Sequence, residues 1–231
     1  HPKIGAKQTH GYYVLDAYRR AAFDRLYDDF FYRRNNEFWK DKAMLKLPAL
    51  LDSTGMLACG EDLGMIPATV PQVMDDLRIL SLEIQRMPKS VEETFAHPAN
   101  YPYLSVCTTS THDMNPIRAW WEEDREVTNQ FWQMILGNQG EAPYFCEPWI
   151  CRQILEQHVW SPAMLTILPL QDWLSMDPQL RREDPNTERI NVPANSRHYW
   201  RYRMHLTLEQ LASADEFNQT LADMIAASGR K

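Results

Sequence analysis

The amino-acid sequence predicts an α/β protein built on a parallel sheet. Four short hydrophobic runs alternate with segments whose apolar residues recur at helical spacing. Consecutive parallel strands need a crossover connection, so strands separated by helices favour a parallel sheet over hairpins. The run at 163–170 is apolar almost throughout, as expected for a strand buried on both faces. Both an open sheet and part of a barrel fit this pattern.

The elements follow one another in a regular order. A long helical pattern comes first, with apolar residues such as Leu15, Tyr18 and Leu26 at three- and four-residue steps. Prolines then mark helix starts, and a break rich in Gly and Pro at 137–148 separates two further helices. The strands are expected at 56–59, 80–85, 104–109 and 163–170. The helices are expected at 14–51, from Pro67 or Pro71 to 77, from Pro116 through Trp121, and at 126–136, 147–159 and 207–227.

Composition excludes several classes of protein. The chain of 231 residues is 44% hydrophobic with 8 Trp, 10 Tyr and 8 Phe, which argues for a globular domain with a real core. A net charge of −7 argues against nucleic acid or an anionic membrane surface as a partner. No apolar run approaches the ~20 residues of a membrane helix. The four cysteines show no CxxC spacing, so we expect reduced core thiols in a cytoplasmic protein and no metal site.

Two acidic residues directly follow predicted strands. Glu61 comes after the strand at 56–59, and Asp113 comes after the strand at 104–109. Alternating strand and helix folds place their chemistry at the carboxyl ends of strands, so both carboxylates are candidates for one site. A pair of carboxylates is what glycosidic-bond chemistry needs.

Five motifs in one order carry a resemblance to a known family. They read GEDLG at 60–64, STHD at 110–113, PLQD at 169–172, ERINVP at 188–193 and YWRYR at 199–203. This set resembles the C-terminal half of the 4-α-glucanotransferases of glycoside hydrolase family 77, the amylomaltases or disproportionating enzymes. LEIQRMP at 82–88 looks most like the large branch that includes the plant cytosolic transglucosidases.

The resemblance implies a partial (β/α)8 barrel, comprising about the last four strands with their helices and a C-terminal helix. Residues 1–231 would then be the C-terminal half of the catalytic barrel. Its parts would be a helical lead-in at 11–51, β/α units at 56–174, and an active-site loop with a closing helix at 175–231.

The resemblance also implies a retaining transfer of an α-1,4-glucan segment from a donor to an acceptor, without metal or organic cofactor. By this match Glu61 is the general acid/base, and Asp113 is the third carboxylate beside the anomeric carbon. Substrate contacts would come from His112, Gln171, Asp172, Arg189 and Asn191. The substrates would be maltooligosaccharides, starch or glycogen.

One part of the family pattern is missing. Retaining catalysis needs a second carboxylate as nucleophile, which this family carries in an Arg-x-Asp-His type motif upstream of the residues present here. The early candidates lack such a motif: Asp16, Asp24, Asp28 and Asp29. The chain also begins with His rather than Met. We therefore expect a piece of a longer polypeptide, inactive alone, whose open sheet edges pair with the missing N-terminal half or with a second copy.

Simpler interpretations stand beside these. Glu61 and Asp62 can cap the helix that follows, and His112 with Asp113 can form an ordinary turn. Arg189 and Asn191 can hold their own loop together. We expect at least one of Trp120 and Trp121 in the core, a structural role for Trp200, and the histidines other than His112 at the surface. The alternative function is a non-catalytic carbohydrate-binding or assembly module that completes a barrel with another chain.

Overall fold

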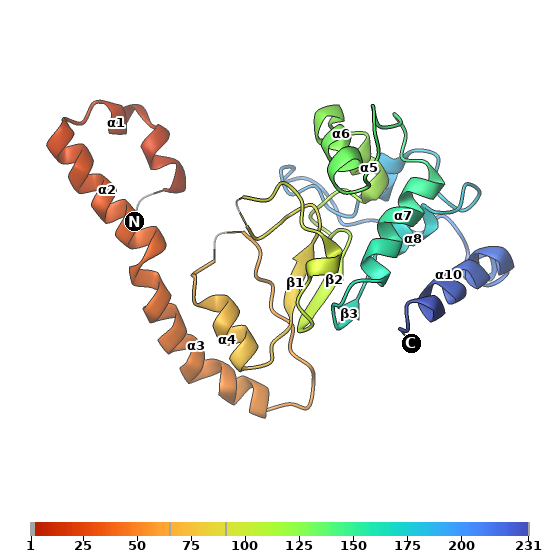
Figure 1. The fold of residues 1–231 in the computed structure, drawn as a ribbon, viewed down its shortest axis with the longest axis horizontal. Helices are drawn as coiled ribbons and strands as arrows, with labels where there is room; N and C mark the ends of the chain where they lie inside the picture. The colour runs from red at the N-terminus through yellow and green to blue at the C-terminus, as the bar shows by residue number, and fades with distance from the viewer. Residues whose placement is uncertain (1–2, 65, 91, 231) are drawn as a thin grey trace. The chain divides into compact units, whose positions relative to one another are not determined.

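The computed structural model describes residues 3–64, 66–90 and 92–230 (Figure 1). The chain divides into two compact units, His1–Ser81 and Leu82–Lys231. The chain has an α/β fold in which helices accompany a small sheet.

The first unit is helical. It contains η1 (Ile4–Gln8), α1 (His10–Tyr13), α2 (Ala17–Tyr32), α3 (Arg34–Asp52) and α4 (Val70–Asp76). The Asp16 carboxylate caps α2 by accepting the Arg19 amide at 2.8 Å. The predicted helix at 14–51 is therefore right in kind but is two helices, because Arg33 leaves the helical conformation with φ −130° and ψ −71°.

The prediction of a strand at 56–59 is wrong, because only Cys59 of this segment forms a bridge. A single parallel bridge joins Cys59 to Leu80. It is supported by hydrogen bonds from the Gly60 amide to the Leu80 carbonyl at 2.8 Å and from the Leu80 amide to the Ala58 carbonyl at 3.0 Å. Met56 and Leu57 lie exposed before the bridge, so this end of the segment finds no neighbouring strand in the described part of the chain.

The sheet has three strands in the order β1-β2-β3. They are β1 (Ser81–Ile84), which begins at the boundary between the units, β2 (Ser105–Thr108) and β3 (Leu165–Thr166). Strands β2 and β3 pair in parallel, with Val106 opposite Leu165 and Cys107 opposite Thr166. The two middle predicted strands, at 80–85 and 104–109, are confirmed to within one residue at each end.

The last predicted strand, at 163–170, is much shorter than expected. Its ladder with β2 ends where the Ile167 amide donates to the Cys107 carbonyl at 3.0 Å. Pro169 has no amide hydrogen and stands at the N-cap of α8 (Leu170–Leu174), so the chain turns into a helix at this point. Ile167 is 61% exposed, which also contradicts the expected burial on both faces.

Helices make up most of the second unit. They are η2 (Pro98–Asn100), α5 (Ile117–Trp121), α6 (Arg125–Met134), α7 (Pro148–Val159), η3 (Pro185–Glu188), α9 (Leu208–Ala212) and α10 (Asp215–Ala227), besides α8. Pro116 is the N-cap of α5 rather than its first residue. The predicted closing helix at 207–227 is two helices, which Ser213 and Ala214 separate.

The main core lies in the second unit and is aromatic. Trp121 and Phe131 are fully buried, and Phe131 meets Phe95 and Trp120 edge-on at centroid distances of 5.1 Å. Trp121 confirms the expectation that at least one of the two adjacent tryptophans belongs to the core.

One histidine and one cysteine lie elsewhere than predicted. His158 is fully buried rather than at the surface, and its Nδ1 is 2.8 Å from the Ile154 carbonyl. Burial lowers the pKa of His158 to about 4, so the ring is neutral at pH 7. All four cysteines are free thiols, but Cys59 is exposed and therefore is not the core thiol that the sequence indicated.

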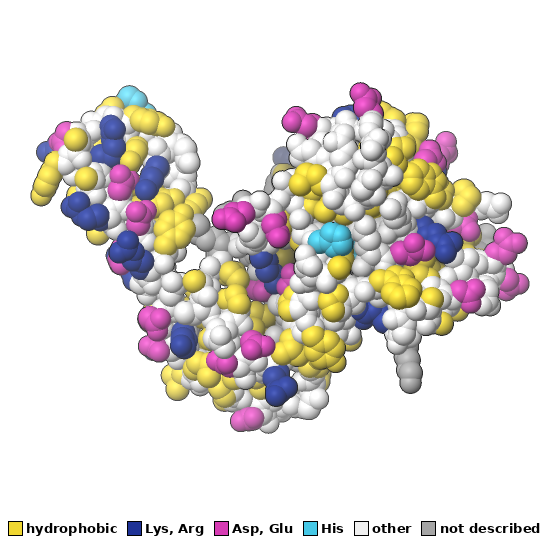
Figure 2. All heavy atoms as spheres, in the orientation of Figure 1, with side chains coloured by type: hydrophobic (Ala, Val, Ile, Leu, Met, Phe, Trp, Pro, Cys, Tyr) yellow, Lys and Arg dark blue, Asp and Glu magenta, His cyan; other side chains and the backbone are white. Residues whose placement is uncertain are grey.

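Hydrophobic side chains reach the surface of the first unit (Figure 2). Tyr18 is 81% exposed on α2, Leu45 is 70% exposed on α3, and Leu26 and Phe38 are each 62% exposed. Within the described ranges, no helix combines the length and the apolar character that crossing a membrane requires.

Candidate active site

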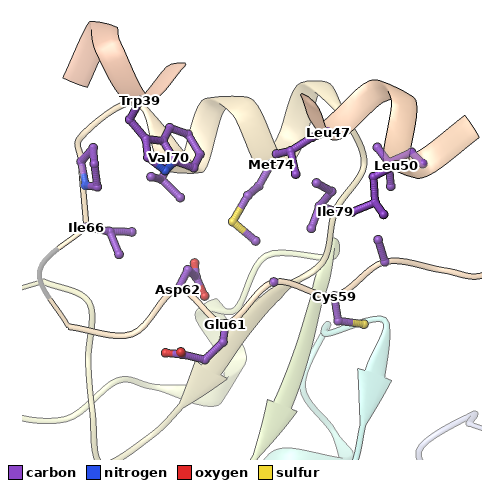
Figure 3. Close-up of a pocket in the computed structure, with 14 residues that line it drawn as sticks. Trp39, Leu47, Leu50, Cys59, Glu61, Asp62, Ile66, Val70, Met74 and Ile79 are labelled. Carbon is purple, nitrogen blue, oxygen red and sulfur yellow. The ribbon is translucent and has the colours of Figure 1, made fainter. Parts of the chain in front are cut away.

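The Glu61 segment directly follows the bridge at Cys59. Glu61 is exposed, and one of its carboxylate oxygens accepts the Leu63 amide at 3.1 Å. Asp62 is 4% exposed. Both residues line the apolar pocket, and Figure 3 shows their carboxylates diverging. Glu61 is thus the member of the pair that solvent and ligands can reach.

Two glycines shape this segment. A Cβ on Gly60 would lie 2.9 Å from the Met74 methyl group, so glycine allows the chain to pass close to α4. Gly64 has φ 74°, in the left-handed region that favours glycine. Behind the segment lies an apolar pocket of about 290 Å³ lined by residues such as Trp39, Leu47 and Met74 (Figure 3).

Helix capping does not explain the acidic pair. Helix α4 begins at Val70, and its N-cap is Thr69, well beyond Glu61 and Asp62. The loop between them is tied to α3, because the Ala68 amide donates to the Asn36 side-chain oxygen at 3.0 Å and the Thr69 hydroxyl donates to the Asn36 carbonyl at 3.0 Å.

The Asp113 segment is a turn that follows β2. His112 and Asp113 are about half exposed, and His112 Nε2 lies 3.3 Å from Asp113 Oδ2. The side-chain amide of Asn191 donates to Asp113 Oδ1 at 2.5 Å. Arg189 Nε in turn donates to the Asn191 carbonyl at 2.9 Å. The structure thus brings four predicted site residues together, and it also confirms that Arg189 stabilises its own loop.

Asp172 lies beneath this turn rather than on its surface. Its carboxylate is fully buried, and Oδ2 accepts the hydroxyls of Thr109 at 2.5 Å and Ser110 at 2.9 Å. Oδ1 accepts the amide of Ile117 at 2.8 Å. One carboxylate therefore holds both ends of the segment that carries His112 and Asp113.

Arg86 supports the same segment from the end of β1. Its Nη2 donates to the carbonyls of Thr109 and Asn115, both at 2.8 Å, and its guanidinium lies 4.8 Å from the Trp120 ring centre. Burial lowers the pKa of Arg86 to about 10, so it is still a cation at pH 7. Arg86 was not among the predicted site residues, although an arginine directly after a predicted strand was a usable signal.

Gln171 joins α8 to the loop at 185–191. It is 5% exposed and donates to the Glu188 carbonyl at 3.2 Å. Glu188 is itself buried beside Arg118, with 3.6 Å between Oε1 and Nη1, and burial raises the pKa of Glu188 to about 7. Gln171 and Asp172 both face protein groups here, and their contact with sugar stays a prediction.

Trp200 is an exposed aromatic residue beside the turn. Its ring centroid lies 4.8 Å from that of His112, and the side chain is 59% exposed. The contact with His112 is compatible with the structural role expected for Trp200, which stays a prediction.

The seven predicted site residues lie in two separate units. Glu61 belongs to the first unit, and the other six belong to the second. No group of three His, Cys, Asp or Glu residues that could hold a metal ion occurs within residues 3–64, 66–90 and 92–230.

Comparisons with known proteins agree on one family. The family model described as 4-alpha-glucanotransferase, glycoside hydrolase family 77, matches residues 9–208. The chain is 39% identical over 230 residues to a 4-alpha-glucanotransferase DPE2 of Oryza sativa subsp. japonica, covering all of this chain and 24% of that protein. It is 30% identical over 215 residues to a 4-alpha-glucanotransferase of Chlamydia muridarum, covering 92% of this chain and 40% of that protein.

A solved structure shows the same fold. An amylomaltase from Streptococcus agalactiae, in complex with acarbose, superposes with a TM-score of 0.58 at 18% identity, covering 79% of this chain and 34% of that one. The chain therefore spans less than half the length of these relatives. Since the family model covers residues 9–208, this chain belongs to the 4-alpha-glucanotransferases of glycoside hydrolase family 77.

Proposed function

We propose that the protein carrying this sequence transfers α-1,4-glucan segments from a donor to an acceptor maltooligosaccharide with retention of configuration. The observation that carries the proposal is the exposure of Glu61 and Asp113, each within five residues of the end of a strand or bridge, in a chain of this family. Relatives with the family name support the reaction class, and maltooligosaccharides, starch or glycogen are the proposed substrates.

Each carboxylate has a separate role in this proposal. Glu61 protonates the departing glycosidic oxygen and then accepts a proton from the incoming acceptor hydroxyl. Asp113 stays ionised beside the anomeric carbon and stabilises its developing positive charge. Asn191 and His112 fix the orientation of Asp113 through contacts at 2.5 and 3.3 Å. No metal or organic cofactor takes part in these steps.

The nucleophile, in this proposal, lies outside the chain. The early aspartates are held in helical positions: Asp16 caps α2, Asp24 accepts the Tyr12 hydroxyl at 2.9 Å, Asp28 pairs with Lys7 at 3.3 Å, and Asp29 pairs with Arg34 at 2.7 Å. These engagements support a chain that is inactive alone. They also fit a partial (β/α)8 barrel completed by an N-terminal half or a second copy, and the exposed apolar residues of the first unit agree with such a partner.

The test is a maltotriose assay on the protein as it is encoded, with glucose and longer oligomers separated by chromatography. Glu61→Gln should lower transfer about 10²–10⁴-fold while glucan binding persists, because the amide keeps the shape but cannot shuttle a proton. Asp113→Asn should lower transfer about 10²–10³-fold. Glu141→Gln, at another exposed glutamate, is the matched control and should leave transfer unchanged.

The same assay on the 231-residue chain by itself distinguishes the two candidate functions. No products from folded chain, with transfer restored by adding the upstream half in trans, would support the enzyme. Glucan binding without transfer in the protein as encoded would instead support a non-catalytic binding or assembly module. A product ladder from the chain alone would show that it contains its own nucleophile. A cytoplasmic location is part of the proposal and rests on the four free thiols; cell fractionation tests it.

A further inference from the structure

A polar pocket of about 450 Å³ lies in the second unit, between the stretches 182–189 and 198–203. Four arginines line it, Arg182, Arg189, Arg201 and Arg203, together with His198. The other lining residues carry amide or hydroxyl groups, and none is Asp or Glu. This concentration of positive charge contrasts with the net charge of −7 of the whole chain.

Within the described ranges, these four arginines are not paired with carboxylates, although the charge of Arg182 also acts on the buried Glu188. Of the acidic residues close to them along the chain, Glu188 is buried beside Arg118, Asp184 Oδ1 accepts the Asn186 amide at 2.9 Å, and Glu183 is exposed. In the part of the chain that the structure describes, none of the four arginines forms an ion pair with a carboxylate. The pocket therefore presents a surplus of cations to whatever enters it.

Two of the four guanidinium groups lie over tyrosine rings. Arg182 lies over the Tyr202 ring at 5.5 Å and donates to the Arg203 carbonyl, and its Nε is buried without a hydrogen-bond partner among the described residues. Arg201 lies over the Tyr199 ring at 4.6 Å. Stacking of this kind orients the planar guanidinium and leaves its N–H groups available to bind an anion.

The pocket adjoins the Asp113 turn. Arg189 lines it and also donates to the Asn191 carbonyl, while the Asn191 amide contacts Asp113. Tyr199 and Arg201 line it on either side of Trp200 in the sequence, and Trp200 meets His112 at 4.8 Å. An anion in this pocket would therefore lie next to the group that we assign to sugar binding.

We propose that the four-arginine pocket binds a phosphate monoester carried by a sugar, either on a phosphorylated glucan or on a free sugar phosphate. A phosphate dianion offers several oxygens to the N–H forks of arginine, which makes it a better match for four guanidiniums than a single carboxylate. The volume of about 450 Å³ leaves room for a sugar ring beside the phosphate. Phosphate binding is independent of the proposed function, whereas a phosphorylated glucan as the natural carrier rests on it.

Isothermal titration calorimetry of the protein as encoded tests the site without any transfer reaction. The probes are inorganic phosphate, glucose 6-phosphate and, as the uncharged control, glucose. We expect binding of both phosphates and at least tenfold weaker binding of glucose. Tighter binding of glucose 6-phosphate than of inorganic phosphate would support a sugar phosphate as ligand. Binding of neither phosphate, or equal affinity for glucose and glucose 6-phosphate, would overturn the proposal.

Two exposed arginines allow the site to be removed with little risk to the fold. The double substitution Arg201→Gln and Arg203→Gln should weaken phosphate binding at least tenfold. Arg201→Lys should have a smaller effect, because lysine keeps the positive charge but lacks the planar set of N–H donors of arginine. Arg197→Gln, an exposed arginine of the same loop outside the pocket lining, is the matched control and should bind as the parent chain does. Unchanged phosphate affinity in the folded double variant would show that the anion binds elsewhere.

The natural carrier is tested separately on the protein as encoded, by comparing binding of phosphorylated and unphosphorylated maltodextrins. A preference for the phosphorylated chain that Arg201→Gln with Arg203→Gln abolishes would support a glucan carrier. Equal binding of the two maltodextrins, with glucose 6-phosphate still bound, would instead assign the pocket to a free sugar phosphate. This binding measurement does not depend on transfer activity. Failure of the proposed function can therefore be distinguished from failure of the phosphate-binding proposal.

Discussion

The two acidic segments of the molecule are held in different ways. The turn with Asp113 is fixed from beneath by buried side chains, since Asp172 and Arg86 each bind backbone or hydroxyl groups on both sides of it. The segment with Glu61 is shaped mainly by its backbone, through the close approach of Gly60 to α4 and the positive φ of Gly64. A site residue can therefore be positioned either by distant buried residues or by its immediate neighbours in the chain.

The largest effect is expected from removing the buried support. Asp172→Ala leaves two hydroxyls and the Ile117 amide without their acceptor, and it removes the negative charge nearest Arg86. We expect a loss of about 3–5 kcal/mol in the free energy of unfolding, measured by urea denaturation. Amide exchange of residues 110–115 should accelerate as well, because the turn loses the contacts that Asp172 makes at both of its ends.

The control for this change is Asp113→Ala. Asp113 is half exposed at the top of the same turn, so its loss should change the free energy of unfolding by less than about 0.5 kcal/mol. Similar losses in the free energy of unfolding of the two variants would contradict this interpretation. They would show that Asp172 is no more important to the turn than a surface carboxylate.

This contrast explains which parts of the site were predictable. The positions of Glu61 and Asp113 after strands followed from local hydrophobic runs, which are properties of short segments. The burial of Asp172 did not, because it depends on Thr109 and Ser110, which are distant in the sequence. A polar residue beside a predicted active-site loop can equally face the ligand or the protein interior, and the sequence pattern is the same in both cases.

The same reasoning applies to the fold. The two middle strands were predicted well because each is a short apolar run between polar segments. The first and last predicted strands were too long, since strand length depends on neighbours that pair with each residue, and single-segment patterns carry no such information. Arg33 and the pair Ser213 and Ala214 interrupt long amphipathic patterns without any Gly or Pro, so both breaks were missed.

A second test concerns the loop that supplies Asn191. Burial raises the pKa of Glu188 from 4.5 to about 7, so the folded state holds this proton more tightly than the unfolded chain does. The free energy of unfolding should therefore decrease as the pH rises from 5 to 7.5, by up to about 1.4 kcal/mol per pH unit from this group. Glu188→Gln should remove that part of the slope in urea denaturation.

Glu183→Gln is the matched control, since Glu183 is exposed in the same loop. Its pH dependence should follow that of the parent chain. A parent slope of the opposite sign that Glu188→Gln removes would mean that Arg118 stabilises the ionised form of Glu188 more than burial destabilises it.

A third, smaller effect tests the backbone control of the Glu61 segment. Gly64→Ala places a side chain at φ 74°, which should cost about 1 kcal/mol and accelerate amide exchange in residues 60–64. Gly55→Ala is the control, because a Cβ at Gly55 meets nothing within 4 Å and its φ is not positive. Equal exchange in the two variants would show that the left-handed turn at Gly64 does not determine the conformation of the segment.

The smallest effect is expected at Glu61 itself. Its carboxylate is exposed, and its contact with the Leu63 amide at 3.1 Å can be kept by the amide oxygen of glutamine. Glu61→Gln should therefore change the free energy of unfolding by less than about 0.5 kcal/mol in urea denaturation. A loss above 1 kcal/mol would identify Glu61 as a residue that holds its own loop, and the loss of transfer in this variant would then no longer report on proton transfer. A small loss, beside the large one at Asp172, would distinguish the carboxylate that we propose faces the substrate from the one that holds the Asp113 turn.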